Sequence, residues 1–274
     1  MERPEWLLNV DATSYHEATK RNEYLSSHRL NLFRKCPLAY KQTIDGIMKE
    51  GDTAAFAFGR AVHVFILEGK EAFDAEYVVS DGPQNEKTGK PFGKLTAAYA
   101  KWASEQTKPV IGTEDFAVMQ GMREAVQAHP VAKELLADGI AEGTIRTEWN
   151  GEPVQARLDW WNGKAVVDLK TCNDIDRFRF DVRDYSYIEQ MSFYAHCVAL
   201  VSGRRPEAWL VAVEKREPFR VAVVNIVPTT LDDAIHGHFV NETLRDDADA
   251  MIAELKKCRS TDVWPTRYEH VIRI

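Results

Sequence analysis

Two acidic residues and a lysine near the middle of the chain have the types and the spacing of a metal-dependent active site. Asp159, Asp168 and Lys170 lie within residues 154–171, which read VQARLDWWNGKAVVDLKT. Two carboxylates held close together repel each other unless a positive charge lies between them, and a divalent cation with oxygen ligands at about 2.0 to 2.6 Å would fit there. Lys170 would then direct its ammonium group at an anionic substrate. The alternative is a solvated strand face with one surface ion pair, because Asp-x-Lys triplets are common on exposed strands.

The same segment predicts a β-hairpin that brings these charges together. Asn162-Gly163 lies between two strand-like runs, and Asn-Gly is the strongest short-range signal for a two-residue type I′ turn. Such a turn places Arg157 opposite Asp168 and makes Asp159 its diagonal neighbour, roughly 7 Å away between β carbons. Because side chains alternate along a strand, the charges emerge on one face. The other face is predicted to be apolar and to hold Leu158, Val167 and Leu169.

The composition indicates an ordinary globular protein whose contacts with nucleic acid would be local. The chain has 274 residues, 45% apolar residues and a formal net charge of -7, which allows one large domain with a sizeable core. This charge argues against a protein that coats nucleic acid, so any DNA would have to lie in a cleft or channel. The sequence has no run of about 18 uncharged apolar residues and no signal-peptide pattern, so we expect a cytoplasmic protein without a membrane span.

A buried helix is predicted from about residue 54, with one histidine in its middle. Residues 56–73 read FAFGRAVHVFILEGKEAF and are almost uniformly apolar up to Glu68. His63 in such a helix is either a hydrogen-bonded core residue or a ligand. Gly59, one turn earlier on the same side, would leave room for another backbone or for a substrate, which favours the second interpretation.

A second Asn-Gly pair, Asn150-Gly151, predicts another hairpin just before the first one. Glu148 is a tempting further ligand because it is acidic and close in sequence. By the same register count it lies opposite Pro153, about 20 Å along the strand from Asp159 at roughly 3.3 Å per residue. Glu148 is therefore excluded from the predicted metal site.

A helix that ends at Gly203 carries a pair of neutral hydrogen-bonding side chains. Gln190 and Tyr194 are four residues apart, so they share one helix face and would present an amide and a phenol side by side. Such groups beside a lysine and a cation suit a phosphodiester backbone. Without those neighbours, Gln-x-x-x-Tyr carries little information.

The remaining segments predict one domain over residues 1–274. Residues 1–24 are polar and poorly periodic, which predicts a loosely held lead-in. Residues 80–94 are rich in Gly, Pro, Asn and Lys and predict a mobile loop, either a basic flap over DNA or a solvated loop. A long amphipathic helix is expected at about residues 231–257. The predicted fold class is mixed α/β, with a central mixed β-sheet that contains the charged hairpin and is flanked by helices.

The candidate residues, taken in chain order, resemble the PD-(D/E)xK nuclease superfamily in its RecB-like branch. Within that branch they are most similar to the RecE-type phage exonucleases, which pair a helix histidine with hairpin acids. The resemblance spans about residues 26–215 and rests on order and spacing, since each motif is short. Leu158 stands where the literal motif has proline, as often in this branch. The residues that carry the resemblance are His63, Asp159, Asp168, Leu169, Lys170, Gln190 and Tyr194.

The resemblance implies a restriction-endonuclease-like fold and a role for each residue. It assigns Lys170 as the catalytic lysine, and Gln190 and Tyr194 as a pair that supports the lysine or contacts DNA. The predicted register adds Arg157, which would pair with Asp168 or hold a phosphate. The implied ligands of Mg²⁺ or Mn²⁺ are His63, Asp159, Asp168 and the carbonyl of Leu169.

The implied activity is hydrolysis of DNA phosphodiester bonds by an exonuclease that acts on duplex ends in phage-type recombination. A ring-like homo-oligomer with DNA in a central channel would reconcile the acidic exterior with this substrate, and a single-strand annealing protein would be its partner. One alternative is an endonuclease that nicks or restricts DNA. Another is a DNA-end-binding or assembly protein that has lost turnover, although the presence of Asp159, Asp168 and Lys170 argues against it.

Overall fold

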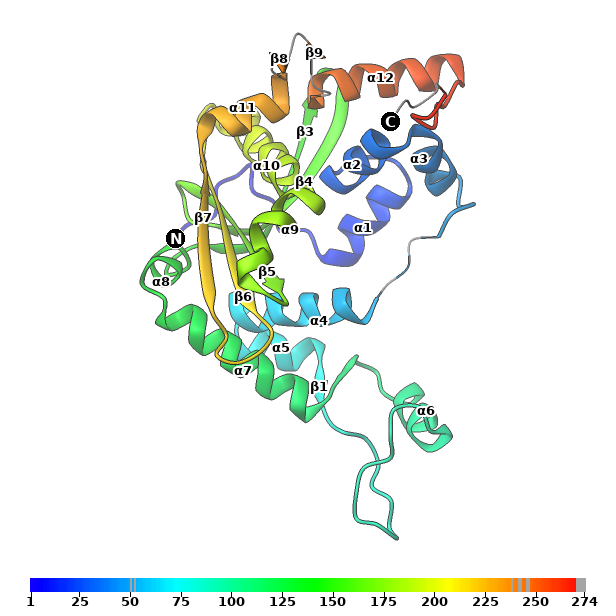
Figure 1. The fold of residues 1–274 in the computed structure, drawn as a ribbon, viewed down its shortest axis with the longest axis vertical. Helices are drawn as coiled ribbons and strands as arrows, with labels where there is room; N and C mark the ends of the chain where they lie inside the picture. The colour runs from blue at the N-terminus through cyan, green and yellow to red at the C-terminus, as the bar shows by residue number, and fades with distance from the viewer. Residues whose placement is uncertain (50, 52, 238, 241–242, 245–246, 270–274) are drawn as a thin grey trace.

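A five-stranded mixed β-sheet with helices on both sides forms the centre of the molecule (Figure 1). The structure is a computed structural model that describes residues 1–49, 51, 53–237, 239–240, 243–244 and 247–269. The strand order is β3-β4-β5-β6-β7, and only the β5–β6 pair is parallel. The predicted fold class is therefore confirmed. The strands are β3 (Ile140–Trp149), β4 (Glu152–Trp161), β5 (Ala165–Cys172), β6 (Glu207–Glu214) and β7 (Val221–Ile226).

Helices cover the two faces of this sheet and divide the core into two clusters. One cluster contains the buried face of α10 (Tyr187–Ser202) together with residues of α2, α3, α11 and α12. The other contains residues of α4, the π-helical turn that follows it, α5, α7 and α8. The helices on the first side are α2 (Ser27–Lys35), α3 (Pro37–Ile44), α11 (Pro228–His236) and α12 (Ala248–Thr261). Those on the second side are α4 (Ala54–His63), α5 (Lys70–Glu76), α7 (Thr113–Ala128) and α8 (Pro130–Leu135).

The first residues of the chain pack on the sheet, so the predicted loosely held lead-in is wrong. Leu7 is only 1% exposed, and Leu8 exchanges backbone hydrogen bonds with Thr144 of β3. Helix α1 (Ala12–Lys20) follows, capped by Asp11, and buries Tyr15 against β4. This segment contributes few apolar side chains to the core. Because polar residues outnumber them, they produce no clear periodicity in the sequence.

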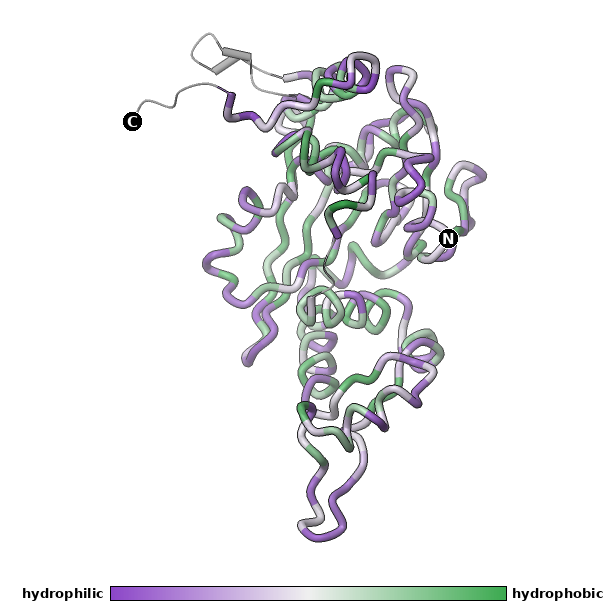
Figure 2. The backbone as a smooth tube through the Cα atoms, turned by 90° about the vertical axis from the view of Figure 1, so that its right-hand side faces the viewer, coloured by the Kyte–Doolittle hydropathy of each residue, from purple (hydrophilic) through white to green (hydrophobic). Residues whose placement is uncertain are grey.

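The loop predicted at residues 80–94 projects from the body of the molecule (Figure 1) and is mostly hydrophilic (Figure 2). It lies between the short parallel pair β1 (Val78–Val79) and β2 (Val110–Ile111), together with α6 (Ala97–Ser104). Its mobility and any role as a flap over DNA stay predictions.

The sequence predicted one long helix at about residues 231–257, but the structure has two separate helices there. Helix α11 ends at Gly237, whose positive φ of 75° suits a residue without a β carbon. Helix α12 starts separately with Asp247 as its cap, and Asp247 accepts a hydrogen bond from the backbone of Ala250 at 2.7 Å. Gly237 at the end of α11 and the cap Asp247 at the start of α12 therefore divide the predicted helix into two.

The hairpin at Asn150-Gly151 is confirmed. Both residues have positive φ, 50° and 73°, as a type I′ turn requires, and the turn joins β3 to β4. Glu148 pairs with Pro153, as the register count predicted, so it lies away from Asp159.

The hairpin at Asn162-Gly163 forms, but its predicted register is wrong by two residues. Trp161 pairs with Val166 and Trp160 with Val167, so the loop spans residues 162–165. The reason is the side chain of Asn162, whose Oδ1 accepts the backbone N–H groups of Lys164 at 3.1 Å and Ala165 at 2.8 Å. This Asx-type turn replaces the two-residue loop.

A shift of two residues does not by itself change the face of the sheet from which a side chain emerges, because the period of a strand is two. Continuing the observed register places Asp168 opposite Asp159, and no longer opposite Arg157. The predicted common apolar face is divided, since Val167 and Leu169 join the core cluster under α4 and α7, whereas Leu158 joins the one under α10. Glu142, opposite this part of β4, has a φ of 54°, which marks a local distortion of the hairpin.

Candidate active site

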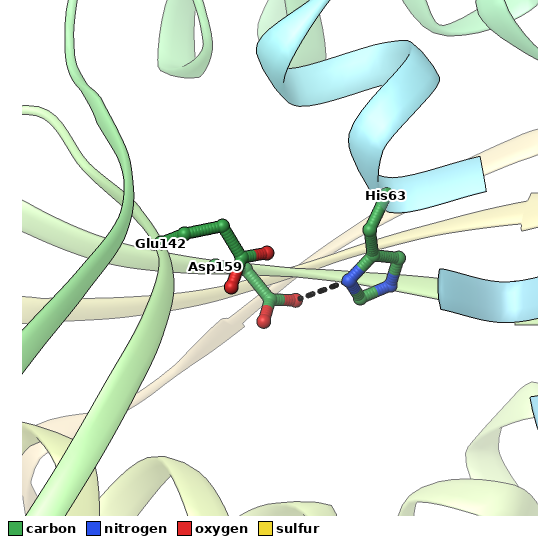
Figure 3. A group of neighbouring side chains, drawn as sticks. All are labelled: His63, Glu142 and Asp159. Atoms are coloured by element: carbon green, nitrogen blue, oxygen red, sulfur yellow. Dashed lines mark ion pairs between the residues drawn. The ribbon is translucent and has the colours of Figure 1, made fainter. Parts of the chain in front are cut away.

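Asp159 lies at the centre of the candidate site. It follows Leu158 on β4, where the β4–β5 pairing gives way to side-chain contacts. Its Oδ2 accepts the backbone N–H of Leu169 at 2.9 Å and lies 3.5 Å from Nδ1 of His63 (Figure 3). Because the carboxylate replaces a backbone link between the strands, its position is fixed by the sheet itself.

His63 reaches Asp159 from the end of α4. The Thr53 hydroxyl caps this helix by accepting the N–H of Phe56, close to the predicted start. A π-helical turn, Val64–Glu68, follows the histidine. Single π-helical turns inside helices are frequent at functional sites, because they re-aim the neighbouring side chains. The imidazole is 23% exposed, so it is not a fully enclosed core histidine.

Glu142 on β3 is the third residue around this point, and it was not among the residues predicted from the sequence. One ligand atom each from His63, Glu142 and Asp159 lie within 4.8 Å of one another (Figure 3). The signal was present, because the register that places Glu148 opposite Pro153 also places Glu142 opposite Asp159.

Arg157 does not pair with Asp168, because the register of the second hairpin differs from the prediction. Its Nε donates to Oε2 of Glu142 at 2.5 Å, and its Nη1 donates to the carbonyl of Val10 at 2.6 Å. The guanidinium therefore connects the N-terminal segment to an acid of the candidate site.

On the other side of Asp159, Asp168 and Lys170 form a buried ion pair. Asp168 is 0% exposed, and Nζ of Lys170 lies 2.6 Å from its Oδ2. Its Oδ1 is also buried and accepts no hydrogen bond from the part of the chain that the structure describes. Buried carboxylate oxygens normally have a partner, so this atom has capacity for one more ligand.

Gln190 and Tyr194 share one face of α10, as the helix pattern predicted, and they lie beside the lysine, as the resemblance implied. Lys170 Nζ donates to Oε1 of Gln190 at 3.0 Å, and Nε2 of Gln190 donates to the hydroxyl of Tyr194 at 2.9 Å. The ammonium also lies 4.5 Å from the ring centre of Tyr187, at the start of α10. The sequence analysis did not single out Tyr187. Together these groups hold the lysine in one orientation.

Comparison with known proteins places this arrangement in a family. The family described as "PDDEXK-like domain of unknown function (DUF3799)" matches residues 26–272. The chain belongs to this PDDEXK-like family. No curated protein matches the chain. A crystal structure from Eubacterium rectale, described as a "Putative exonuclease", shares the fold with a TM-score of 0.67 and 14% sequence identity, over 97% of this chain and 96% of that one.

The expected membership of the PD-(D/E)xK superfamily and the nuclease-like fold are thereby confirmed. The RecE-type assignment stays a resemblance. No helix in the described ranges of this PDDEXK-like chain has the length and apolarity needed to cross a bilayer.

The donor set of the PDDEXK-like domain suits a divalent cation such as Mg²⁺ or Mn²⁺. It combines an imidazole nitrogen with the carboxylates of Glu142 and Asp159. The predicted ligand Asp168 is not part of this group, but it follows in register opposite Asp159 and its Oδ1 has no hydrogen-bond partner among the described residues. Hard divalent cations prefer oxygen ligands, and imidazole is tolerated by Mn²⁺. The Leu169 carbonyl stays a predicted ligand, since the contact of this residue with the site is made by its N–H.

The charges of the site support the same conclusion. Burial and the neighbouring carboxylate of Asp168 raise the pKa of Asp159 to about 7, so ionisation of this acid is costly without an added positive charge. Burial by itself would lower the pKa of Lys170, but Asp168 and Asp159 outweigh it and raise the pKa above its ordinary value. Burial also raises the pKa of Tyr194, which keeps its phenol neutral.

Proposed function

We propose that the protein is a metal-dependent nuclease that hydrolyses DNA phosphodiester bonds, and that it acts as an exonuclease on duplex ends. The observation that carries the proposal is the position of Asp159, with His63 and Glu142 on one side and the Asp168–Lys170 pair on the other. Hydrolysis of a phosphodiester requires positive charge at the phosphate and an activated water.

We assign the ligands of Mg²⁺ or Mn²⁺ to His63, Glu142, Asp159 and Asp168. When bound, the cation would supply positive charge at the scissile phosphate and make water a stronger nucleophile at neutral pH. The chain's own contribution is to hold three carboxylates and an imidazole in place before the substrate arrives. The sheet fixes Asp159 and Asp168, whereas Arg157 orients Glu142.

Lys170 presents a fixed positive charge to the substrate. Asp168, Gln190 and the ring of Tyr187 surround its ammonium and restrict its orientation. A cation held in this way stabilises the negative charge that develops on the phosphate, and no side chain has to reorganise during the reaction. We therefore assign Lys170 an electrostatic role.

The finer parts of the proposal rest on resemblance. One solved structure with the same fold is described as a "Putative exonuclease", which favours action on ends. The order of the motifs favours a RecE-like role in phage-type recombination, with a ring-like homo-oligomer and a single-strand annealing protein as partner. A substrate path inside an oligomer would also suit the net charge of -7.

The test is to incubate end-labelled linear DNA and closed circular DNA with the purified protein and Mg²⁺. We expect progressive loss of the linear label, intact circles, and no activity with a chelator or in Lys170→Ala. The matched control is Lys164→Ala, which removes an exposed lysine from the turn of the same hairpin.

Each other outcome contradicts a stated part of the proposal. Cleavage of circles would indicate an endonuclease. Tight DNA binding without cleavage, unchanged in Asp168→Asn, would indicate an inactive end-binding protein. Full activity of Lys170→Ala would overturn the assignment of the site.

A further inference from the structure

An aromatic surface that also carries three arginines lies next to the proposed catalytic lysine. It comprises the exposed side chains of η2 (Ile175–Arg177), α9 (Phe178–Asp184) and the residue that follows. Tyr185 is 65% exposed and Phe180 is 41% exposed, although both are large aromatic side chains. We call it the α9 surface, and its members are Arg177, Arg179, Phe180, Arg183 and Tyr185.

Two ring contacts connect this surface to the active centre. The rings of Tyr185 and Tyr187 are stacked, with centroids 5.7 Å apart and an interplanar angle of 28°. Tyr187 in turn lies 4.5 Å from Nζ of Lys170. Single exposed aromatic residues are common and need no explanation, but this one extends a continuous stack that begins at the candidate catalytic lysine.

The backbone at Ser186 holds the stack in place. Ser186 has φ 58° and ψ 41°, a left-handed conformation that few non-glycine residues adopt. Its N–H donates to the carbonyl of Arg183 at 3.1 Å, and its carbonyl accepts the N–H of Gln190 at 3.0 Å. A strained residue that the surroundings hold on both sides is typical of functional sites. The same residue thus positions Tyr185 and starts the helix that carries Gln190.

The cations of the α9 surface are available to an anionic ligand. Within the described residues, Arg177 and Arg179 have no acidic partner, and they lie 5.9 Å and 4.7 Å from the ring centre of Phe180. Arg183 donates to Oδ1 of Asp184 from Nε and from Nη2, both at 3.4 Å, and both side chains are more than half exposed. The other acids of this segment are Asp174 and Asp176, which pair with Arg220, and Asp181 on α9. Exposed pairs of this kind contribute little and exchange readily.

We propose that Tyr185 is a stacking platform for an unpaired base of the DNA strand at the active centre, with the arginines of the α9 surface in contact with its phosphates. This inference rests on the proposed nuclease function. Alternating arginines and aromatic rings are the combination that binds single strands, because every base has a face that can stack and every nucleotide carries a phosphate. The protein would therefore engage frayed or single-stranded ends of duplex DNA, with the terminal base held on Tyr185 and its phosphate near Lys170.

The test measures binding and not cleavage, so it is independent of turnover. Duplex DNA with a short single-stranded tail carries 2-aminopurine in the tail, and Ca²⁺ replaces Mg²⁺. Stacking on an aromatic ring quenches the fluorescence of 2-aminopurine. The wild type is compared with Tyr185→Ala, with Tyr185→Trp, and with Tyr268→Ala, which removes a tyrosine that is 71% exposed in the C-terminal segment.

We expect Tyr185→Ala to weaken binding of tailed DNA by about 5- to 150-fold and to abolish the quench, in line with the loss of one base–aromatic stack. Tyr185→Trp should retain both, and Tyr268→Ala should match the wild type. Blunt duplex without a tail should be bound less tightly by the wild type and less affected by the substitution.

Unchanged affinity and quench in Tyr185→Ala would overturn the inference, and so would an equal loss in Tyr268→Ala. A quench that depends on Tyr185 in a protein that cleaves no DNA with Mg²⁺ would uphold the platform and contradict the proposed nuclease. If the protein cleaves DNA and Tyr185→Ala changes neither cleavage nor binding, the proposed nuclease would be upheld and the platform contradicted.

Discussion

The two sides of the candidate site, which meet at Asp159, differ in how their charges are compensated. On the closed side, Asp168 is buried, Lys170 is 14% exposed, and a chain of contacts continues from them through Gln190 to Tyr194. On the open side, His63 and Glu142 are 23% and 19% exposed, and their ligand atoms converge with Asp159 without a short contact between the imidazole and that carboxylate.

The difference indicates that one side contributes mainly to stability and the other mainly to metal binding. The closed side carries its own counter-charge in Lys170, so it contributes to stability before a cation binds, and Oδ1 of Asp168 stays open to one. The open side gathers donor atoms that gain most from an added cation, because converging carboxylates repel each other. Substitutions on the closed side should therefore affect folding and activity together, whereas those on the open side should affect metal binding.

The largest effect is expected for Lys170→Met. This substitution leaves Asp168 buried without its counter-charge, and breaking a buried pair in this way costs about 3–5 kcal/mol. Urea unfolding at pH 7 should show this loss of stability, together with loss of DNA cleavage. If Lys170→Met were as stable as the wild type, the Asp168–Lys170 pair would not contribute to the stability of the fold.

The next effect is a dependence of metal-free stability on pH, which originates at Asp159. Its pKa is about 7 in the folded protein and lies near its ordinary value of 3.8 when unfolded, so the folded state binds more protons in between. Stability should therefore fall as the pH rises from about 4 to 7, by roughly 2 kcal/mol after allowance for coupling to Asp168.

Thermal unfolding of metal-free protein between pH 5 and 7.5 checks this expectation. Asp159→Asn should flatten the profile, and Mn²⁺ should restore the stability of the wild type at pH 7.5. An equal slope in Asp159→Asn would assign the dependence to other groups.

A smaller effect is expected for Glu142→Gln, which removes one charge from the open side. It should weaken Mn²⁺ binding by at least about tenfold, since changes around metal ligands typically cost 10- to 100-fold, and leave stability nearly unchanged. Calorimetric titration measures the Mn²⁺ affinity, and thermal unfolding measures the stability. Glu148→Gln is the matched control, because Glu148 lies on the same strand but is exposed and opposite Pro153. Equal behaviour of the two variants would remove Glu142 from the site.

The smallest effect is expected for Arg157→Gln, which acts through Glu142. Loss of the 2.5 Å contact would leave Glu142 less well oriented, so Mn²⁺ affinity should fall by about threefold to tenfold. Arg146→Gln on the same hairpin, which pairs with Gln155, should have no such effect. If the Arg157 variant bound Mn²⁺ as the wild type does, the arginine would only anchor the N-terminal segment.

The sequence predicted the chemistry of the site better than its exact contacts. Strand periodicity predicted one face for Asp159, Asp168 and Lys170, but Asp159 contacts His63 of α4, whereas Asp168 and Lys170 lie with Gln190 of α10. The two Asn-Gly turns show that the exact geometry of a turn could not be predicted from the dipeptide. Asn150 adopts the left-handed conformation of a type I′ turn, whereas Asn162 uses its side chain to accept two backbone N–H groups. Both solutions suit the same dipeptide, and tertiary packing selects between them.

Other features depended on contacts between distant segments. Glu142 could be derived from the first hairpin, but its role requires the approach of His63 from α4. The contribution of the first residues could not be derived, because Leu7 becomes buried only where Gly143 of β3 leaves space for it. A β carbon at Gly143 would lie 2.6 Å from Cδ1 of Leu7. Local patterns do not contain this information.

The position of bound Mn²⁺ tests the central claim most directly. Anomalous diffraction from crystals soaked in Mn²⁺ locates the ion independently of any assay of activity. We expect an ion in contact with Asp159 and with at least His63 or Glu142, and no ion at that position in Asp159→Asn. An ion bound elsewhere, or none at saturating Mn²⁺, would contradict the assignment of these residues as a metal-dependent nuclease site.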